Sequence, residues 1–181
     1  MKNEESFSLL SSRDLIAGSS DKNAGQRPVT FILHSYLLKK EKTMMIITNN
    51  ARGLRNNNPG NIRYIGSPWV GLDTPPTDGA FCRFKEAKYG IRALARTLLT
   101  YDEKYKLNTI YDIITRFAPP CENNTDSYIR HVCAELDCRH DEKIGIRPNI
   151  FKLTRAIIRH ENGRCPYSDL EIMEGIALVS A

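Results

Sequence analysis

Apolar residues recur at helical spacing through most of the chain after residue 87. The segments 88–105 and 110–117 both repeat them with the 3.6-residue period of an amphipathic helix. Asn108 or Thr109 is placed to cap the second helix, and "APP" (118–120) is expected to end it, because proline cannot continue a helix. The apolar positions are Ile91, Leu94, Ala95, Leu98 and Leu99 in the first helix and Ile110, Ile113, Ile114 and Phe117 in the second.

Three further helices are predicted towards the C-terminus. "NNTDSYIRHVCAEL" (123–136) begins with good capping residues, and "RPNIFKLTRAIIRHENG" (147–163) ends in a glycine at the expected C-terminal cap. "SDLEIMEGIALV" (168–179) begins with a serine cap and predicts a shorter last helix.

Residues 52–85 have a different pattern. They are dense in Asn, Gly and Pro, with short apolar stretches such as "NIRYI" (61–65) and "AFCRF" (80–84). Such a pattern predicts turns between short strands, and so a small β-hairpin lobe. The predicted fold class is mostly α (α+β), a single helical domain over residues 51–181 with a β-hairpin lobe near its start.

Residues 1–50 are rich in Ser, Gly, Asp and Asn and show no sustained period, so they are predicted to be a disordered extension. Within them, residues 29–38 could form a short strand or helix. Met44 and Met45 stand just before the first well-patterned segment. One hypothesis is therefore that translation begins at one of these two methionines.

Composition narrows the class of protein. Of the 181 residues, 41% are hydrophobic and 26% are charged, as in a globular domain, and no apolar run approaches the roughly 20 residues of a membrane span. No secretory signal follows the start, so classical export is not expected and synthesis in the cytoplasm is. The net charge of +5 permits anionic partners. Lys88, Arg92 and Arg96 would form a basic stripe, but binding of nucleic acid is not expected without a known motif.

Metal and cofactor chemistry is not indicated by any motif. The chain has no P-loop, GxSxG, HExxH or EF-hand pattern, and its five cysteines lack zinc-site spacing. We therefore predict no metal and no cofactor, and reduced thiols.

Glu161, in "IIRHENG" (157–163), is the first candidate catalytic residue. It lies four residues after Ile157 and three after Ile158, so it continues the apolar face of its helix. Apolar surroundings and the negative end of the helix dipole both disfavour a carboxylate, and should raise its pKa towards that of a general acid. The alternative is that the helix end leaves the core and Glu161 points into water.

Glu122 is the second candidate, near the start of the helix predicted at 123–136. There the helix dipole favours the ionised carboxylate, which suits either the positioning of water or a simple capping interaction. Asn124 and Tyr128, on the same segment, are candidate substrate-binding residues.

"RNNNPGNIRY" (55–64) is the third feature. Asparagine amides both donate and accept hydrogen bonds, which suits sugar hydroxyl and N-acetyl groups, and an indole face stacks well on a sugar ring. The alternative is a plain turn beside a core tryptophan. The candidate substrate-binding residues here are Asn57, Asn58, Asn61, Tyr64 and Trp69.

Taken together, "RGLRNNNPGNIRY", "GIRALARTLLTY", "APPCENNT" and "AIIRHENG" resemble a group of small phage and prophage proteins described as virion or structural proteins. The resemblance covers about residues 52–178. It implies a virion role and other virion proteins as partners.

A second resemblance concerns lysozyme-like glucosaminidases and lytic transglycosylases. Their catalytic glutamate ends a helix in a pattern similar to "AIIRHENG", and an Asn-rich lobe with "W.G" is similar to residues 58–71. The order is reversed here, so the resemblance implies a circularly permuted lysozyme-like domain with Glu161 beside the lobe from Asn58 to Trp69.

Two hypotheses follow. In the first, the chain cleaves the glycan strands of peptidoglycan in the periplasm or cell wall, with Glu161 as the general acid and Glu122 as a second carboxylate. In the second, it is a non-catalytic structural or wall-binding protein of a virion.

Overall fold

The computed structural model describes residues 33–40, 51–121 and 123–180. Residues 33–40 form a helix with exposed side chains, in agreement with one of the two forms predicted for residues 29–38. This helix belongs to a different unit from the body of the protein, Glu41–Ala181. Met44, Met45 and most of the extension predicted to be disordered lie outside the described residues.

The five predicted helices of the body are all present. Four of them begin or end where the capping residues indicate: Thr109 accepts a hydrogen bond from the Asp112 amide, Asn124 accepts one from the Ser127 amide, and Ser168 forms a capping box with Glu171. Gly163 follows the fourth of the five helices with a φ of 71°. The helices are α3 (Ala87–Tyr105), α4 (Ile110–Phe117), α5 (Thr125–Leu136), α6 (Ile146–Asn162) and α7 (Asp169–Ala177).

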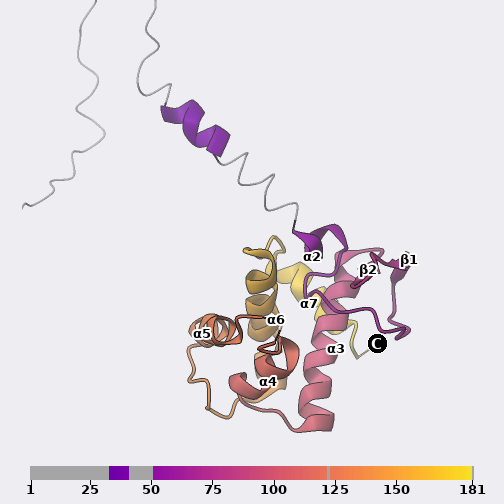
Figure 1. The fold of residues 1–181 in the computed structure, drawn as a ribbon, viewed down its shortest axis with the longest axis vertical. Helices are drawn as coiled ribbons and strands as arrows, with labels where there is room; N and C mark the ends of the chain where they lie inside the picture. The colour runs from indigo at the N-terminus through magenta and orange to yellow at the C-terminus, as the bar shows by residue number, and fades with distance from the viewer. Residues whose placement is uncertain (1–32, 41–50, 122, 181) are drawn as a thin grey trace, which may run out of the picture. The chain divides into compact units, whose positions relative to one another are not determined.

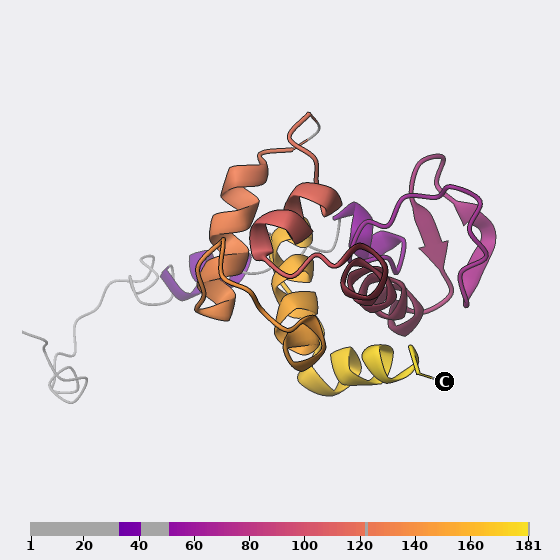
Figure 2. The same cartoon turned by 90° about the horizontal axis from the view of Figure 1, so that it is seen from below.

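One apolar core joins these helices. α3 packs against α6 and α7, and α5 packs against α4 and α6. In Figures 1 and 2, α5, α6, α3 and the hairpin follow one another across the body. Most positions that the 3.6-residue pattern selected in α3 and α4 lie in this core, with Phe117 partly buried against it. Leu153, Ile157 and Ile158 are among the residues that α6 contributes. In the described parts of the chain, no helix combines the length and apolar character needed to cross a bilayer.

The lobe is a two-stranded antiparallel hairpin, so the predicted mostly α (α+β) class is confirmed. Its strands are β1 (Leu72–Thr77) and β2 (Cys82–Phe84). The strand predicted in "AFCRF" is present, whereas "LDTPPT", which was not predicted to be a strand, is β1. Prolines are tolerated there because, among the described residues, β1 has a strand partner on one side only.

Two further local differences lie next to the hairpin. Residues Arg52–Arg55 form a single helical turn, α2, where turns between strands were predicted. The prediction of a strand in "NIRYI" is wrong. In this segment only Arg63 forms a β-bridge, to Phe81. The Asn58 amide donates to the Ile62 carbonyl and accepts from the Ile62 N–H. These side-chain hydrogen bonds replace part of the backbone pairing expected of a strand.

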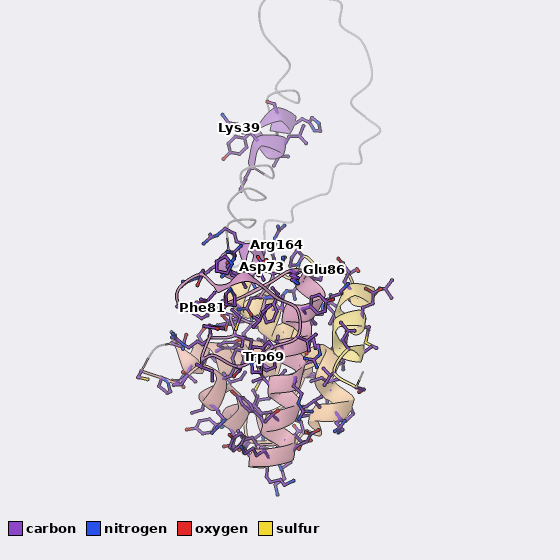
Figure 3. All side chains as sticks on the ribbon, turned by 90° about the vertical axis from the view of Figure 1, so that its right-hand side faces the viewer. Lys39, Trp69, Asp73, Phe81, Glu86 and Arg164 are labelled. Carbon is purple, nitrogen blue, oxygen red and sulfur yellow. The ribbon has the colours of Figure 1, made fainter. Side chains whose placement is uncertain are left out.

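Figure 3 shows how densely side chains fill the space between lobe and helices, with Trp69, Asp73 and Phe81 marking the lobe. A second apolar cluster lies under the hairpin. Buried Cys82 and Phe84 of β2 pack there against Ala93 of α3, with Tyr64 and Trp69 at the edge. This cluster fixes the lobe against α3 and so determines where the Asn-rich loop runs.

Candidate functional site

Glu161 lies one residue before the end of α6, in the wall of a surface groove. It continues the buried face formed by Leu153, Ile157 and Ile158, as its spacing predicted, and is half-buried. The alternative, in which Glu161 points into bulk water, does not apply in this structure.

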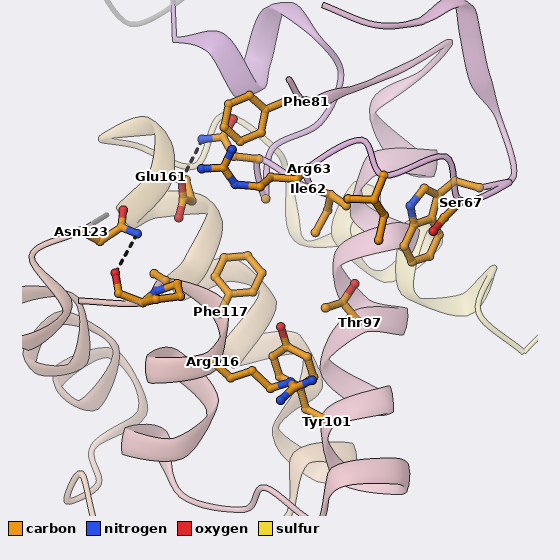
Figure 4. A pocket seen from close by; sticks show the side chains of 16 residues that line it. Ile62, Arg63, Ser67, Phe81, Thr97, Tyr101, Arg116, Phe117, Asn123 and Glu161 are labelled. Atoms are coloured by element: carbon orange, nitrogen blue, oxygen red, sulfur yellow. Dashed lines mark hydrogen bonds between the residues drawn. The ribbon is translucent and has the colours of Figure 1, made fainter. Parts of the chain in front are cut away.

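Both oxygens of the Glu161 carboxyl accept a hydrogen bond. The Asn61 Nδ2 donates to Oε2 at 2.8 Å, and the Tyr128 hydroxyl donates to Oε1 at 2.9 Å. Three segments far apart in the sequence meet here: the Asn-rich loop, α5 and α6. The Asn61 contact is drawn as a dashed line in Figure 4. The carboxyl group is therefore held in one orientation at the groove surface.

The pKa of Glu161 is raised above its ordinary value. Burial is the largest cause, because it disfavours the charged form, and the hydrogen bonds from Asn61 and Tyr128 act in the opposite direction. Burial also raises the pKa of Tyr128 well above its ordinary value, so this phenol stays a neutral donor. The site thus holds a carboxylic acid that keeps its proton to higher pH than an exposed glutamate does.

Tyr128 is itself fixed by its neighbours. It is 2% exposed, stacks on the His160 ring at 3.6 Å between centroids, and meets the Phe117 ring edge-on at 6.4 Å. The predicted substrate-binding residue Tyr128 is therefore too buried to contact a ligand widely, and its polar contact is with Glu161.

The Asn-rich loop takes its shape from its own amides. Asn57 and Asn61 have φ values of 50° and 47°, in the left-handed region that asparagine tolerates better than most residues. The Asn58 amide is 0% exposed, and its Nδ2 donates to the carbonyls of Ile62 and Cys82. Asn57 Nδ2 donates to the carbonyls of Phe84 and Lys85. Asn57 and Asn58 thus fold the loop and do not line the groove.

The groove has a volume of about 700 Å³, within the usual range of ligand sites. The lobe side is formed by Ile62, Ser67 and Trp69, and the helix side by Thr97 and Tyr101 of α3 with Phe117 at the end of α4. Figure 4 shows the side chains of Ile62, Thr97, Tyr101 and Phe117 facing a common space, with Glu161 at one end of it and Ser67 at the other.

Of the predicted site residues, the structure brings together Glu161, Asn61, Tyr128 and Trp69. Tyr64 packs in the second apolar cluster, and Asn124 caps α5 by accepting from the Ser127 amide. These two residues do not line the groove. Glu122 lies outside the described residues.

Sequence reasoning did not identify several residues of the groove wall. Arg116 and Arg63 line it, as does Asn123, whose Nδ2 donates weakly to the Pro119 carbonyl at 3.5 Å. Tyr101 could have been found, because it lies three residues after Leu98 and continues the apolar face of α3 towards the groove. No sequence signal distinguished Arg116 from the other arginines.

The basic stripe on α3 is engaged within the protein. Lys88 pairs with Glu86 at 2.9 Å, Arg92 donates to the Leu178 carbonyl at 2.9 Å, and Arg96 pairs with Glu103 at 3.0 Å. All three side chains of the predicted stripe are therefore engaged in contacts within the protein.

The fold and the groove define a mostly helical α+β protein with a half-buried glutamic acid in a ligand-sized groove. The chain is 41% identical, over 132 residues, to protein P5 of Pseudoalteromonas phage PM2. The match covers 71% of this chain and 82% of that protein, so the chain belongs to the phage P5 family. The predicted kinship with phage proteins is thereby confirmed. No known protein-family profile matches the chain.

Proposed function

We propose that the chain is a muralytic protein of phage or prophage origin that cleaves the glycan strands of peptidoglycan. The observation that carries this proposal is Glu161, a half-buried carboxylic acid with a raised pKa in the wall of a 700 Å³ groove. A general acid for glycosidic bonds needs such an environment, because it must hold a proton near neutral pH.

In the proposed reaction Glu161 donates its proton to the glycosidic oxygen as the bond to the sugar carbon breaks. The resulting carboxylate is stabilised by the hydrogen bonds from Asn61 and Tyr128. It then accepts a proton from the attacking group, either water or a hydroxyl of the same sugar, and so returns to its starting form.

The number of carboxylates in the groove helps to distinguish attack by water from attack by a hydroxyl of the same sugar. Hydrolases with two carboxylates hold them roughly 5–9.5 Å apart. Glu161 is the only acidic residue among the described residues that line the groove, and Glu122, the second candidate, is not among those described. Glu122 therefore stays the proposed second carboxylate of a hydrolase, whereas the route in which a hydroxyl of the substrate attacks needs Glu161 alone.

The rest of the groove suits a sugar chain. Trp69 and Tyr101 offer aromatic faces for stacking, and Thr97 and Asn123 offer hydrogen-bonding groups. Asn57 and Asn58 enter the proposal as residues that position the loop, and Tyr128 as a residue that positions Glu161.

The resemblance to lysozyme-like enzymes gives further support. A circular permutation requires the glutamate of the late helix to lie beside the early Asn-rich lobe. The hydrogen bond between Asn61 and Glu161 joins residues 100 positions apart in this way.

A second candidate is a non-catalytic structural or wall-binding protein of a virion, favoured by membership of a phage protein family. In both cases we propose virion proteins as partners. The muralytic proposal adds the periplasm or cell wall as the place of action.

Zymography on purified cell wall tests the muralytic proposal. Wild type should clear the substrate, and Glu161→Gln should lose roughly 10²–10⁴-fold in rate, the usual contribution of a general acid. Glu174→Gln, an exposed substitution on α7 with the same change of charge, should clear like wild type. Clearing by none of the three would favour the structural role, and normal clearing by Glu161→Gln would exclude Glu161 as the acid.

A further inference from the structure

The groove carries more positive than negative charge. Arg63 and Arg116 line it, and Glu161 is the only acidic residue among the described residues that do so. Among the described lining residues, two guanidinium groups therefore outnumber one carboxyl group. Figure 4 shows Arg63 on the lobe side and Arg116 on the opposite side.

Arg116 is held by aromatic rings. Its guanidinium carbon lies 3.8 Å from the centroid of the Tyr105 ring and 5.4 Å from that of Tyr101. Other arginines nearby are bound by acids: Arg96 and Arg147 both pair with Glu103. In the described parts of the chain no ion pair engages Arg116, which is exposed at the groove.

Arg63 has a related arrangement on the facing wall. Its guanidinium carbon lies 5.2 Å from the centroid of the Phe81 ring, and its side chain is exposed. Stacking on the Tyr105 ring restricts the Arg116 guanidinium to one plane. This guanidinium is suited to planar anions, because a guanidinium edge binds a carboxylate with two parallel hydrogen bonds, and Arg63 adds a second positive charge on the facing wall.

We infer that the groove selects glycans that carry carboxylates over neutral glycans of the same backbone, with Arg116 as the main specificity-determining residue and Arg63 assisting. This inference rests on the proposed function and names the substrate class of the same site. In peptidoglycan the carboxylate has two sources: the lactyl group on the sugar, when no peptide is attached, or the stem peptide.

Calorimetric binding to the full chain carrying Glu161→Gln tests the inference without turnover. The probes are short oligosaccharides of equal length: a glycan with free lactyl carboxyls, the same glycan with these carboxyls methyl-esterified, a peptide-bearing glycan and a neutral chitin oligosaccharide. We expect a carboxylate-bearing probe to bind roughly 10-fold tighter than the methyl ester and chitin. Adding Arg116→Gln should reduce this ratio to roughly 2-fold or less.

Two further variants distinguish the effect of the shape and position of the Arg116 side chain from the effect of its charge. Arg116→Lys should restore part of the ratio, since lysine keeps the charge but not the planar fork. Arg130→Gln removes the same charge from a separate hollow on α5, so it should leave the ratio unchanged. Preference for the free lactyl glycan identifies the sugar as the source of the carboxylate, whereas preference for the peptide-bearing glycan alone identifies the stem peptide. Both results support the inference.

The results that would contradict the inference differ from those that would contradict the proposed function. Equal affinity for charged and neutral probes would overturn the inference, and so would a preference that Arg116→Gln leaves intact. In either case, binding of the glycans would still be consistent with the proposed function. Binding to none of the probes, together with no clearing in zymograms, would overturn both.

Discussion

At the scale of single residues, the site depends on opposing influences on one carboxyl group. Burial of Glu161 favours its protonated form, and the hydrogen bonds from Asn61 and Tyr128 favour the carboxylate. A group of this kind can give up a proton and take it back, because neither form is strongly disfavoured.

These opposing influences predict how activity depends on pH. In the proposed reaction cleavage requires protonated Glu161, so the rate should fall as pH rises through its raised pKa. Tyr128→Phe and Asn61→Ala each remove a hydrogen bond that lowers this pKa, so the alkaline limb should move to higher pH in both variants.

Rates of glycan cleavage across pH measure this limb. Tyr167→Phe is the matched control, since Tyr167 packs against the main core but does not line the groove. A limb that stays in place in both test variants would contradict the assignment of Glu161.

The same pKa predicts a pH-dependent effect on stability. A group whose pKa is raised by folding contributes stability that is complete below its ordinary value, here 4.5, and is lost as pH rises through the raised value. Glu161→Gln cannot ionise, so it avoids this loss. Its amide can still meet Tyr128, and a flipped Asn61 amide can meet the other end through Oδ1, which lacks a partner in the structure.

Thermal unfolding of both proteins provides the measurement. The unfolding temperature of Glu161→Gln relative to wild type should be higher at pH 8 than at pH 4. An equal difference at both pH values would mean that Glu161 ionises without cost in the folded protein.

At the scale of elements, α3 and the Asn-rich loop are in backbone contact at Gly90. A Cβ atom there would lie 2.0 Å from the Asn57 carbonyl oxygen and 2.9 Å from the Pro59 ring. The loop that carries Asn61 can therefore approach α3 only if residue 90 has no side chain.

Gly90→Ala should accordingly destabilise the protein by roughly 2–4 kcal/mol and displace the loop from Glu161. Gly66→Ala, with a φ of 81° and no atom within 4 Å of the added Cβ, should cost only about 1 kcal/mol of backbone strain. Chemical denaturation compares the two. Similar losses in both variants would show that the contact at Gly90 contributes nothing.

The helices could be predicted from the sequence because periodicity and capping residues act locally, as at Thr109, Ser168 and Gly163. The strand β1 could not, because its tolerance for prolines depends on the absence of a second neighbour. Glu161 was found because it lies on a regular helix face. The internal role of Asn58 and the position of Arg116 depend on residues far away in the sequence, and no local pattern records them.

At the scale of the whole molecule, the groove exists only because the lobe, α3, α4 and the end of α6 meet. The glutamate and its partner Asn61 come from opposite ends of the body, so chemistry at this site requires the intact fold. Membership of a phage protein family is compatible with both proposed roles, the muralytic and the structural one.

Mass spectrometry of the products released from purified peptidoglycan tests the central claim most directly. Wild type should release fragments with new ends at glycosidic bonds, and Glu161→Gln, folded by circular dichroism, should release almost none. Fragments lacking one water relative to hydrolysis products would assign the route in which a sugar hydroxyl attacks. Release of such fragments by Glu161→Gln at the wild-type rate, or no cleavage by either protein, would contradict the account.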